Sequence, residues 1–158
     1  MEIVYPGRYR HYKGKNYEVI GEAIHSETME VLVVYRALYG AYGLWVRPKA
    51  MFLEPVMVGD KTVFRFEPII VIQIWYCETE EKQQGYFHQF EVLSREPLSV
   101  MALLAKVHEQ NAECAYRTST YCKEKCSPYL VKINGHEIAG SRKLVNPGET
   151  VSIEPSVK

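Results

Sequence analysis

The residues best suited to chemistry in this sequence are aromatic rings and arginines, which gather in its first third. Tyrosine and tryptophan rings offer flat π faces, and guanidinium groups offer forked donors that stack on rings or grip carboxylate and phosphate groups. Bases, sugars, peptides and small anions bind to surfaces of this kind. The partner would be a small anionic or aromatic ligand, or another protein. We therefore predict a ligand-binding set that consists of Tyr9, Arg10, Tyr35, Arg36, Tyr39, Tyr42, Trp45 and Arg47.

The same rings could instead form a hydrophobic core. Side chains alternate along a strand, so Tyr35 and Arg36 point to opposite faces. Aromatic rings and the stems of arginines often pack inside small domains without binding anything. Two interpretations therefore stay open at this point: a ligand surface, or an aromatic core with arginines at its rim.

A basic stretch from Arg8 to Lys15 holds four basic residues, one histidine and two tyrosines, and it contains no acid. Such a stretch can contact phosphate groups. Glutamates from Glu18 to Glu30 follow closely and oppose its field, and 19 acidic residues balance 19 basic residues over the whole chain. Nucleic acid is therefore a possible partner, but a less favoured one.

His11, His25 and Glu27 offer an enzymatic alternative, because a histidine near a carboxylate can act as a general acid or base near neutral pH. Activation of a nucleophile such as Ser26 requires hydrogen-bond reach, and neighbouring strand residues point to opposite faces. Turn chemistry explains the Ser-Glu-Thr run equally well. Whether the chain is an enzyme stays open.

Cys114, Cys122 and Cys126 are spaced by eight and four residues. Structural zinc sites use shorter knuckles, so we predict neither a metal nor another cofactor. A reversible disulfide or a weak metal site between Cys122 and Cys126 is the alternative, and free thiols are the expectation.

The N-terminus lacks the basic region and apolar run of a signal peptide, and no window approaches 18 consecutive apolar residues. We therefore expect no membrane contact. A cytoplasmic location is the corresponding prediction, and reduced cysteines fit that compartment.

Short β-forming runs separated by turn residues fill residues 1–67. The run from Val31 to Leu38 is apolar on both faces, which indicates a central strand covered on each side. Gly40 and Gly43 separate it from a strand at Leu44 to Arg47, and we expect at least one of these glycines to adopt a positive φ because the chain reverses there. About five short strands at this spacing predict an SH3-like small barrel.

Residues 68–158 change to a strand, strand, helix, strand, strand order. Ser99 suits the N-cap of the helix, whose apolar face is Val100, Leu103, Leu104 and Val107. A helix packed across a mixed four-stranded sheet is the β-grasp arrangement. The predicted fold class is therefore α+β, with an all-β SH3-like small barrel over 1–67 followed by a β-grasp (ββαββ) domain over 68–158.

The sequence from Pro6 to about Phe66 carries PGRYRHYKG, HSET, VYRALYG and LWVRP, followed two residues later by MF. On these motifs it resembles the bacterial family catalogued as domain of unknown function 1653. Ala41 stands where the family leads us to expect an acidic residue. The family has no settled activity, so the resemblance implies a fold-sized unit and assigns no catalytic residue.

The second half carries LSVMALLAKV over the helix, and VKINGHEI and LVNPGETVSIEP over the closing strands. On this pattern it resembles β-grasp domains of the ubiquitin-like and sulfur-carrier kind. Sulfur carriers end in a Gly-Gly tail, whereas this sequence ends in Glu154 to Lys158. We therefore expect a different role, such as that of a ligand-binding β-grasp appendage.

Overall fold

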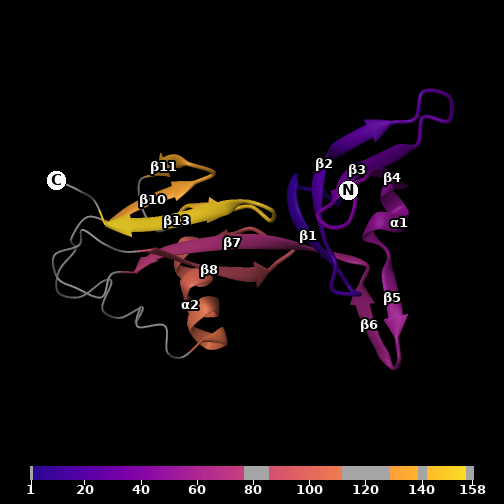
Figure 1. Ribbon diagram of the computed structural model, residues 1–158. Coiled ribbons are helices and arrows are strands. Elements are labelled where there is room, and N and C mark those ends of the chain that lie inside the picture. The colour runs from indigo at the N-terminus through magenta and orange to yellow at the C-terminus, as the bar shows by residue number, and fades with distance from the viewer. Residues whose placement is uncertain (1, 77–85, 112–128, 139–141, 156–158) are drawn as a thin grey trace. The chain divides into compact units, whose positions relative to one another are not determined.

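The computed structural model describes residues 2–76, 86–111, 129–138 and 142–155 (Figure 1). Strands hold 56% and helices 13% of the described chain. The chain divides into two compact units. Unit 1 comprises Met1–Ile69 with Leu93–Arg95, and unit 2 comprises Ile70–Val92 with Glu96–Lys158.

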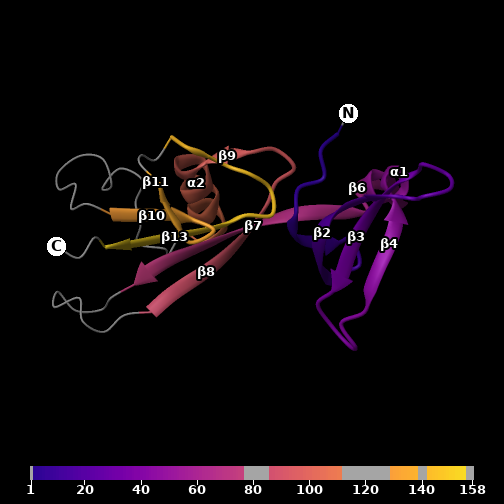
Figure 2. The same ribbon diagram turned by 90° about the horizontal axis from the view of Figure 1, so that it is seen from above.

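Unit 1 is an antiparallel meander with a short helix and a separate hairpin. Its main sheet has the order β7, β1, β2, β3, β4, and β5 pairs with β6 (Figures 1 and 2). Its elements are β1 (Gly7–His11), β2 (Asn16–Ile24), β3 (Val31–Ala37), β4 (Leu44–Pro48), α1 (Lys49–Leu53), β5 (Pro55–Val58), β6 (Lys61–Phe64) and the start of β7 (Phe66–Tyr76).

The core of unit 1 is largely aromatic. Phe52 from α1 stacks on Phe66 from β7, with ring centroids 4.2 Å apart and ring planes 4° from parallel. Strands β1 to β3 contribute four more buried side chains, because alternate residues of each strand face the core, and Val4 before β1 adds another. The buried members of this core are Val4, Tyr9, Val19, Val33, Tyr35, Phe52 and Phe66.

The described residues of unit 2 form a mixed sheet, a separate two-stranded sheet and one helix. Strand β13 runs parallel to β7 and antiparallel to β10, β8 also pairs with β7, β11 pairs with β10, and β9 pairs with β12. Its elements, besides the rest of β7, are β8 (Tyr86–Leu93), β9 (Leu98–Ser99), α2 (Val100–Gln110), β10 (Tyr129–Ile133), β11 (His136–Ile138), β12 (Leu144–Val145) and β13 (Thr150–Pro155).

The predicted helix of unit 2 is confirmed. The Ser99 side chain caps α2 by accepting a hydrogen bond from the backbone N–H of Ala102 at 3.2 Å. Its buried face is the one that the i, i+3, i+4, i+7 spacing predicts, namely Val100, Leu103, Leu104 and Val107. In the described part of the chain, no helix is long and apolar enough to span a membrane.

The predicted fold class, α+β with an SH3-like barrel over 1–67 and a ββαββ domain over 68–158, is wrong. The described chain is mostly β, and no pairing among its residues closes β1 to β4 into a barrel. After β4 the chain turns into α1, and β5 pairs with β6 instead of completing the sheet. Strands β9, β11 and β12 add to the predicted order in the second half. The domain boundary near Glu67 stays a prediction.

The loop between β3 and β4 has the backbone conformation that the sequence predicts. Gly40 has a φ of +59°, and Tyr42 also lies in the left-handed region with a φ of +53°. Gly43 does not, but a Cβ there would come within 3.2 Å of the Trp45 Nε1. The two glycines thus have different roles: Gly40 permits the reversal, and Gly43 leaves room for the indole.

We predict that Gly40→Val lowers the free energy of unfolding by about 1–3 kcal/mol, because a β-branched residue is strained at positive φ. A Cβ at this position would meet nothing within 4 Å, so the loss would report backbone strain and not a clash. Urea unfolding measures the effect. Ala41→Val, an exposed neighbour in the same loop, is the matched control, and equal midpoints for the two variants would contradict the prediction.

Candidate functional site

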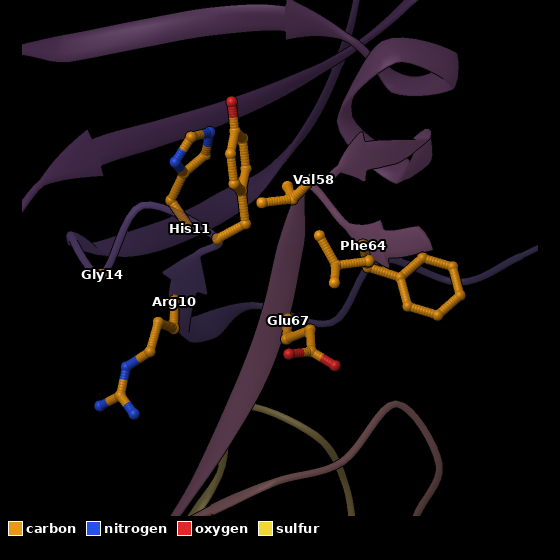
Figure 3. Close-up of a pocket in the computed structure, with 8 residues that line it drawn as sticks. Arg10, His11, Gly14, Val58, Phe64 and Glu67 are labelled. Carbon is orange, nitrogen blue, oxygen red and sulfur yellow. The ribbon is translucent and has the colours of Figure 1, made fainter. Parts of the chain in front are cut away.

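A pocket of about 240 Å³ lies in unit 1 beside the β1–β2 turn and the β5–β6 hairpin (Figure 3). Strand β1 and its turn supply polar and aromatic side chains, the hairpin supplies apolar ones, and β7 supplies an acid. The lining residues are Arg10, His11, Tyr12, Gly14, Val58, Val63, Phe64 and Glu67. Pockets for drug-sized ligands occupy roughly 300–1,000 Å³. This pocket therefore fits a smaller group, such as one ring or one anion.

His11 links the pocket to the aromatic core. Its ring centroid lies 4.4 Å from that of Tyr12 and 4.8 Å from that of Phe66. Its Nδ1 accepts a hydrogen bond from the backbone N–H of Lys13 at 3.3 Å. Because a ring nitrogen that accepts carries no proton, the neutral imidazole holds its proton on Nε2. Nε2 is therefore the nitrogen that can donate to a ligand.

The surroundings of His11 are positively charged. Burial lowers the pKa of His11 below its ordinary value of 6.5, and the charges of Arg65, Lys13 and Arg47 lower it further. Arg10 brings a fourth cationic side chain to the pocket. At neutral pH the imidazole is consequently uncharged, and three cations act on it, whereas the Arg10 guanidinium points away from the His11 ring (Figure 3).

Two glutamates oppose this positive field. Glu54 forms an ion pair with Arg65 at 3.1 Å, although the Arg65 Nε is buried without a hydrogen-bond partner among the described residues. Glu67 is the cross-strand neighbour of Arg10, and Figure 3 shows its carboxylate across the pocket from the His11 ring. The cations outnumber the acids, so the local field is positive while the whole chain is neutral.

Tyr17 connects His11 to a tyrosine cluster, which we define as Tyr17, Tyr35 and Tyr39 with Arg47. The Tyr17 ring centroid lies 6.2 Å from that of His11, 5.6 Å from Tyr35 and 5.4 Å from Tyr39. The Tyr17 and Tyr39 hydroxyls share a hydrogen bond of 2.5 Å, and the Arg47 Nε donates to the Tyr35 hydroxyl at 3.4 Å. Burial, followed by the hydrogen bond to Tyr39, raises the pKa of Tyr17 to about 12. The Tyr17 hydroxyl thus stays protonated at neutral pH.

Five residues of the predicted ligand-binding set lie in the core, in the pocket or in the tyrosine cluster. Tyr9 and Tyr35 are core residues with 3% and 5% of their surface exposed. Arg10 lines the pocket, and Tyr39 and Arg47 belong to the cluster. The core interpretation therefore applies to Tyr9 and Tyr35, and ligand contact by Arg10, Tyr39 and Arg47 stays a prediction.

The other three residues of that set lie outside the pocket and the cluster. Tyr42 and Trp45 are 60% and 58% exposed, in the β3–β4 loop and on β4. Arg36 is exposed and points to the opposite face of β3 from Tyr35. The structure does not gather the eight side chains into one surface, and ligand contact by these three stays a prediction.

The residues of the enzymatic alternative do not converge. His25 follows the last residue of β2, whereas the His11 ring lies beside Tyr17 near its first residue, so a strand of roughly 25 Å separates the two histidines. The His25 Nδ1 accepts hydrogen bonds from the backbone N–H groups of Glu27 and Thr28 at 3.3 and 3.2 Å. Hydrogen bonds within the turn therefore account for the arrangement of His25, Glu27 and Thr28.

Metal ligation is not supported within the described ranges. No group of three or more histidine, cysteine, aspartate or glutamate side chains is placed there to hold an ion. Cys114, Cys122 and Cys126 lie outside the described residues, so the alternative of a disulfide or weak metal site is not tested.

The sequence interpretation missed Tyr17, Glu67 and the apolar wall of the pocket. Tyr17 was detectable, because a tight turn after His11 pairs Tyr9 with Tyr17 and so places both rings on one face. The wall from β5 and β6 was not detectable. It depends on where the hairpin packs, and no local pattern encodes that placement.

Comparisons with known proteins concern the same part of the chain. Residues 7–68 match the model of a family described as protein of unknown function (DUF1653). The crystal structure of a DUF1653 protein from Bordetella bronchiseptica is similar with 41% identity and a TM-score of 0.39, over 42% of this chain and 87% of that one. No protein with a curated description matches the chain. The family match includes the pocket and the tyrosine cluster, and neither comparison confirms the β-grasp resemblance of the second half.

We predict that His11 makes the protein less stable in mild acid. Its pKa is lowered in the folded state, so the unfolded state binds more protons as the pH falls through about 6.5, and the free energy of unfolding decreases there. In urea unfolding at pH 7.5 and 5.5, His11→Gln should lose less stability on acidification than the unmodified protein. His25→Gln, which alters an exposed turn histidine, is the control, and identical pH dependence in all three proteins would contradict the prediction.

Proposed function

We propose a function for unit 1 from one premise: the chain belongs, through residues 7–68, to the DUF1653 family of proteins of unknown function. The family description names no activity, so we base the proposal on the residues that line the pocket. Unit 1 is a noncatalytic binding module. Its pocket takes a small ligand that joins an anionic group to an aromatic or apolar part.

The convergence of cations on His11 carries the anionic half of this proposal. Arg65, Lys13 and Arg47 are close enough to lower the pKa of His11, and Arg10 lines the same pocket. A bound carboxylate or phosphate would offset this repulsion, and forked guanidinium donors match both groups.

The remaining walls support the aromatic or apolar half. Val58, Val63 and Phe64 from the β5–β6 hairpin line one part of the pocket, and the Tyr12 ring lines another. Apolar walls with a few polar groups are usual in small-molecule sites. At about 240 Å³ the pocket has room for one ring with its anionic substituent.

A binding role fits these residues better than acid–base catalysis. Catalysis of that kind needs a carboxylate and a histidine aimed at the same reacting atoms. Here the Glu67 carboxylate lies across the pocket from the His11 ring (Figure 3). The His25 Nδ1 accepts a hydrogen bond from the backbone N–H of Glu27 within their own turn. A terminal phosphate of a nucleic-acid strand could bind to the same cations, so a phosphorylated oligonucleotide is one of the probes in the test.

We predict that phenyl phosphate binds to the full chain and shifts the backbone amide NMR signals of residues 10–14. Arg10→Ala and Lys13→Ala should each weaken binding by about tenfold or more, because a hydrogen bond to a charged group contributes roughly 1.5–3 kcal/mol. Arg36→Ala removes an exposed arginine that does not line the pocket and should leave the affinity unchanged.

Three further probes make this prediction specific. Benzyl alcohol, which has the ring without the anion, should bind at least tenfold more weakly than phenyl phosphate, and inorganic phosphate should bind more weakly too. A short oligonucleotide with a 5′-phosphate tests the nucleic-acid source. Equal binding of phenyl phosphate and benzyl alcohol, or equal losses in Arg10→Ala and Arg36→Ala, would overturn the proposed function.

A further inference from the structure

Strand β4 is an edge strand with large apolar side chains in solvent. Among the described strands it pairs only with β3, and Figure 2 shows it at the margin of the sheet of unit 1. Leu44, Trp45 and Val46 are 59%, 58% and 59% exposed. Edge strands usually carry charges, prolines or bulges that block pairing with another chain. In β4 such residues come only at its end, with Arg47 and Pro48.

The backbone of β4 offers a complete set of donors and acceptors to a further strand. The Ala37 N–H donates to the Gly43 carbonyl at 3.0 Å, which makes these two residues a hydrogen-bonded pair. Hydrogen-bonded and non-hydrogen-bonded pairs alternate along an antiparallel ladder, so the backbone N–H and C=O of Trp45 also point toward β3. Leu44 and Val46 direct their N–H and C=O groups to the free edge. Two residues thus present two donors and two acceptors outward.

A twofold rotation brings the outward N–H groups of Leu44 and Val46 in one chain to the outward C=O groups of the same residues in a second chain. If two β4 strands pair antiparallel with Trp45 opposite Trp45, Leu44 of each chain faces Val46 of the other, and four backbone hydrogen bonds form. A register centred on Val46 would place Leu44 opposite Pro48, which has no N–H. A register centred on Leu44 would use Tyr42, whose N–H already donates to the Tyr39 carbonyl at 3.1 Å. Only the Trp45 register keeps all four bonds.

Side chains and charges favour the same register. Opposed Trp45 residues would form a non-hydrogen-bonded pair, in which Cα atoms approach to about 4.5 Å and aromatic rings contact well. Arg47 would face Gly43, whose missing side chain leaves its space to the Trp45 indole of the same copy. The two Arg47 residues would then lie four positions apart, at roughly 13 Å, which exceeds the Debye length of about 8 Å at physiological salt. No like charges would meet across the strands.

We propose that β4 pairs with β4 of a second copy of this chain, centred on Trp45, to form a twofold dimer with a continuous sheet. No residue of β4 lines the pocket, and Arg47 alone among the β4 residues acts on His11, so the dimer can be tested separately from the anion site. The dimer covers the exposed side chains of Leu44, Trp45 and Val46 and satisfies the free edge of the sheet.

Sedimentation velocity at micromolar concentrations tests the proposal. The full chain should sediment at twice its 18.3 kDa mass. Leu44→Lys places a charge on the edge, and Val46→Pro removes one outward N–H without touching the bonds to β3, so both should sediment as monomers. Ile24→Lys, at an exposed apolar residue of β2, should remain dimeric.

Amide hydrogen exchange identifies the contact itself. The amides of Leu44 and Val46 should become more protected as the protein concentration rises, and this concentration dependence should vanish in Leu44→Lys. A protein that stays monomeric at high micromolar concentration overturns the proposal. A dimer that persists in Leu44→Lys, or one whose Leu44 and Val46 amides stay unprotected, overturns it too, since either result requires another interface or a different partner for this edge.

Discussion

The stacked pair of Phe52 and Phe66 is the contact on which unit 1 depends. Both rings are buried, and three tyrosine rings from β1, β2 and β3 pack around them. Phe52 belongs to a helix of five residues and Phe66 begins β7, so the pair fastens both elements to the meander. His11 packs on Phe66, and the pocket therefore lies where this aromatic core meets solvent.

Local charge, and not total charge, determines what this pocket can hold. The chain has equal numbers of acidic and basic residues, yet three cationic side chains from distant parts of unit 1 act on His11, and Arg10 lines the same pocket. Burial makes these charges matter more, because screening by water and salt is weaker there. A neutral chain can therefore contain an anion site, which composition alone does not reveal.

Local sequence rules predicted the local features correctly. The capping role of Ser99 and the positive φ of Gly40 each depend on a few neighbouring residues, and both are confirmed. The prediction of a closed SH3-like barrel was wrong because β5 and β6 pair with each other and do not extend the sheet of β1 to β4. The predicted ligand set fails to form one surface because strand alternation sends Tyr9 and Tyr35 into the core while Arg36 points away. Long-range packing decides these outcomes, and no short stretch of sequence records it.

The central claim is that the pocket beside His11 is an anion site of a binding module. A crystal structure of the full chain with phenyl phosphate tests it most directly. The account predicts phosphate density in the pocket, within hydrogen-bond distance of the His11 Nε2, with the ring against Val58 and Val63 and the ester bond intact. A ligand seated elsewhere on the chain, or a pocket filled only by water at saturating ligand, would contradict the account.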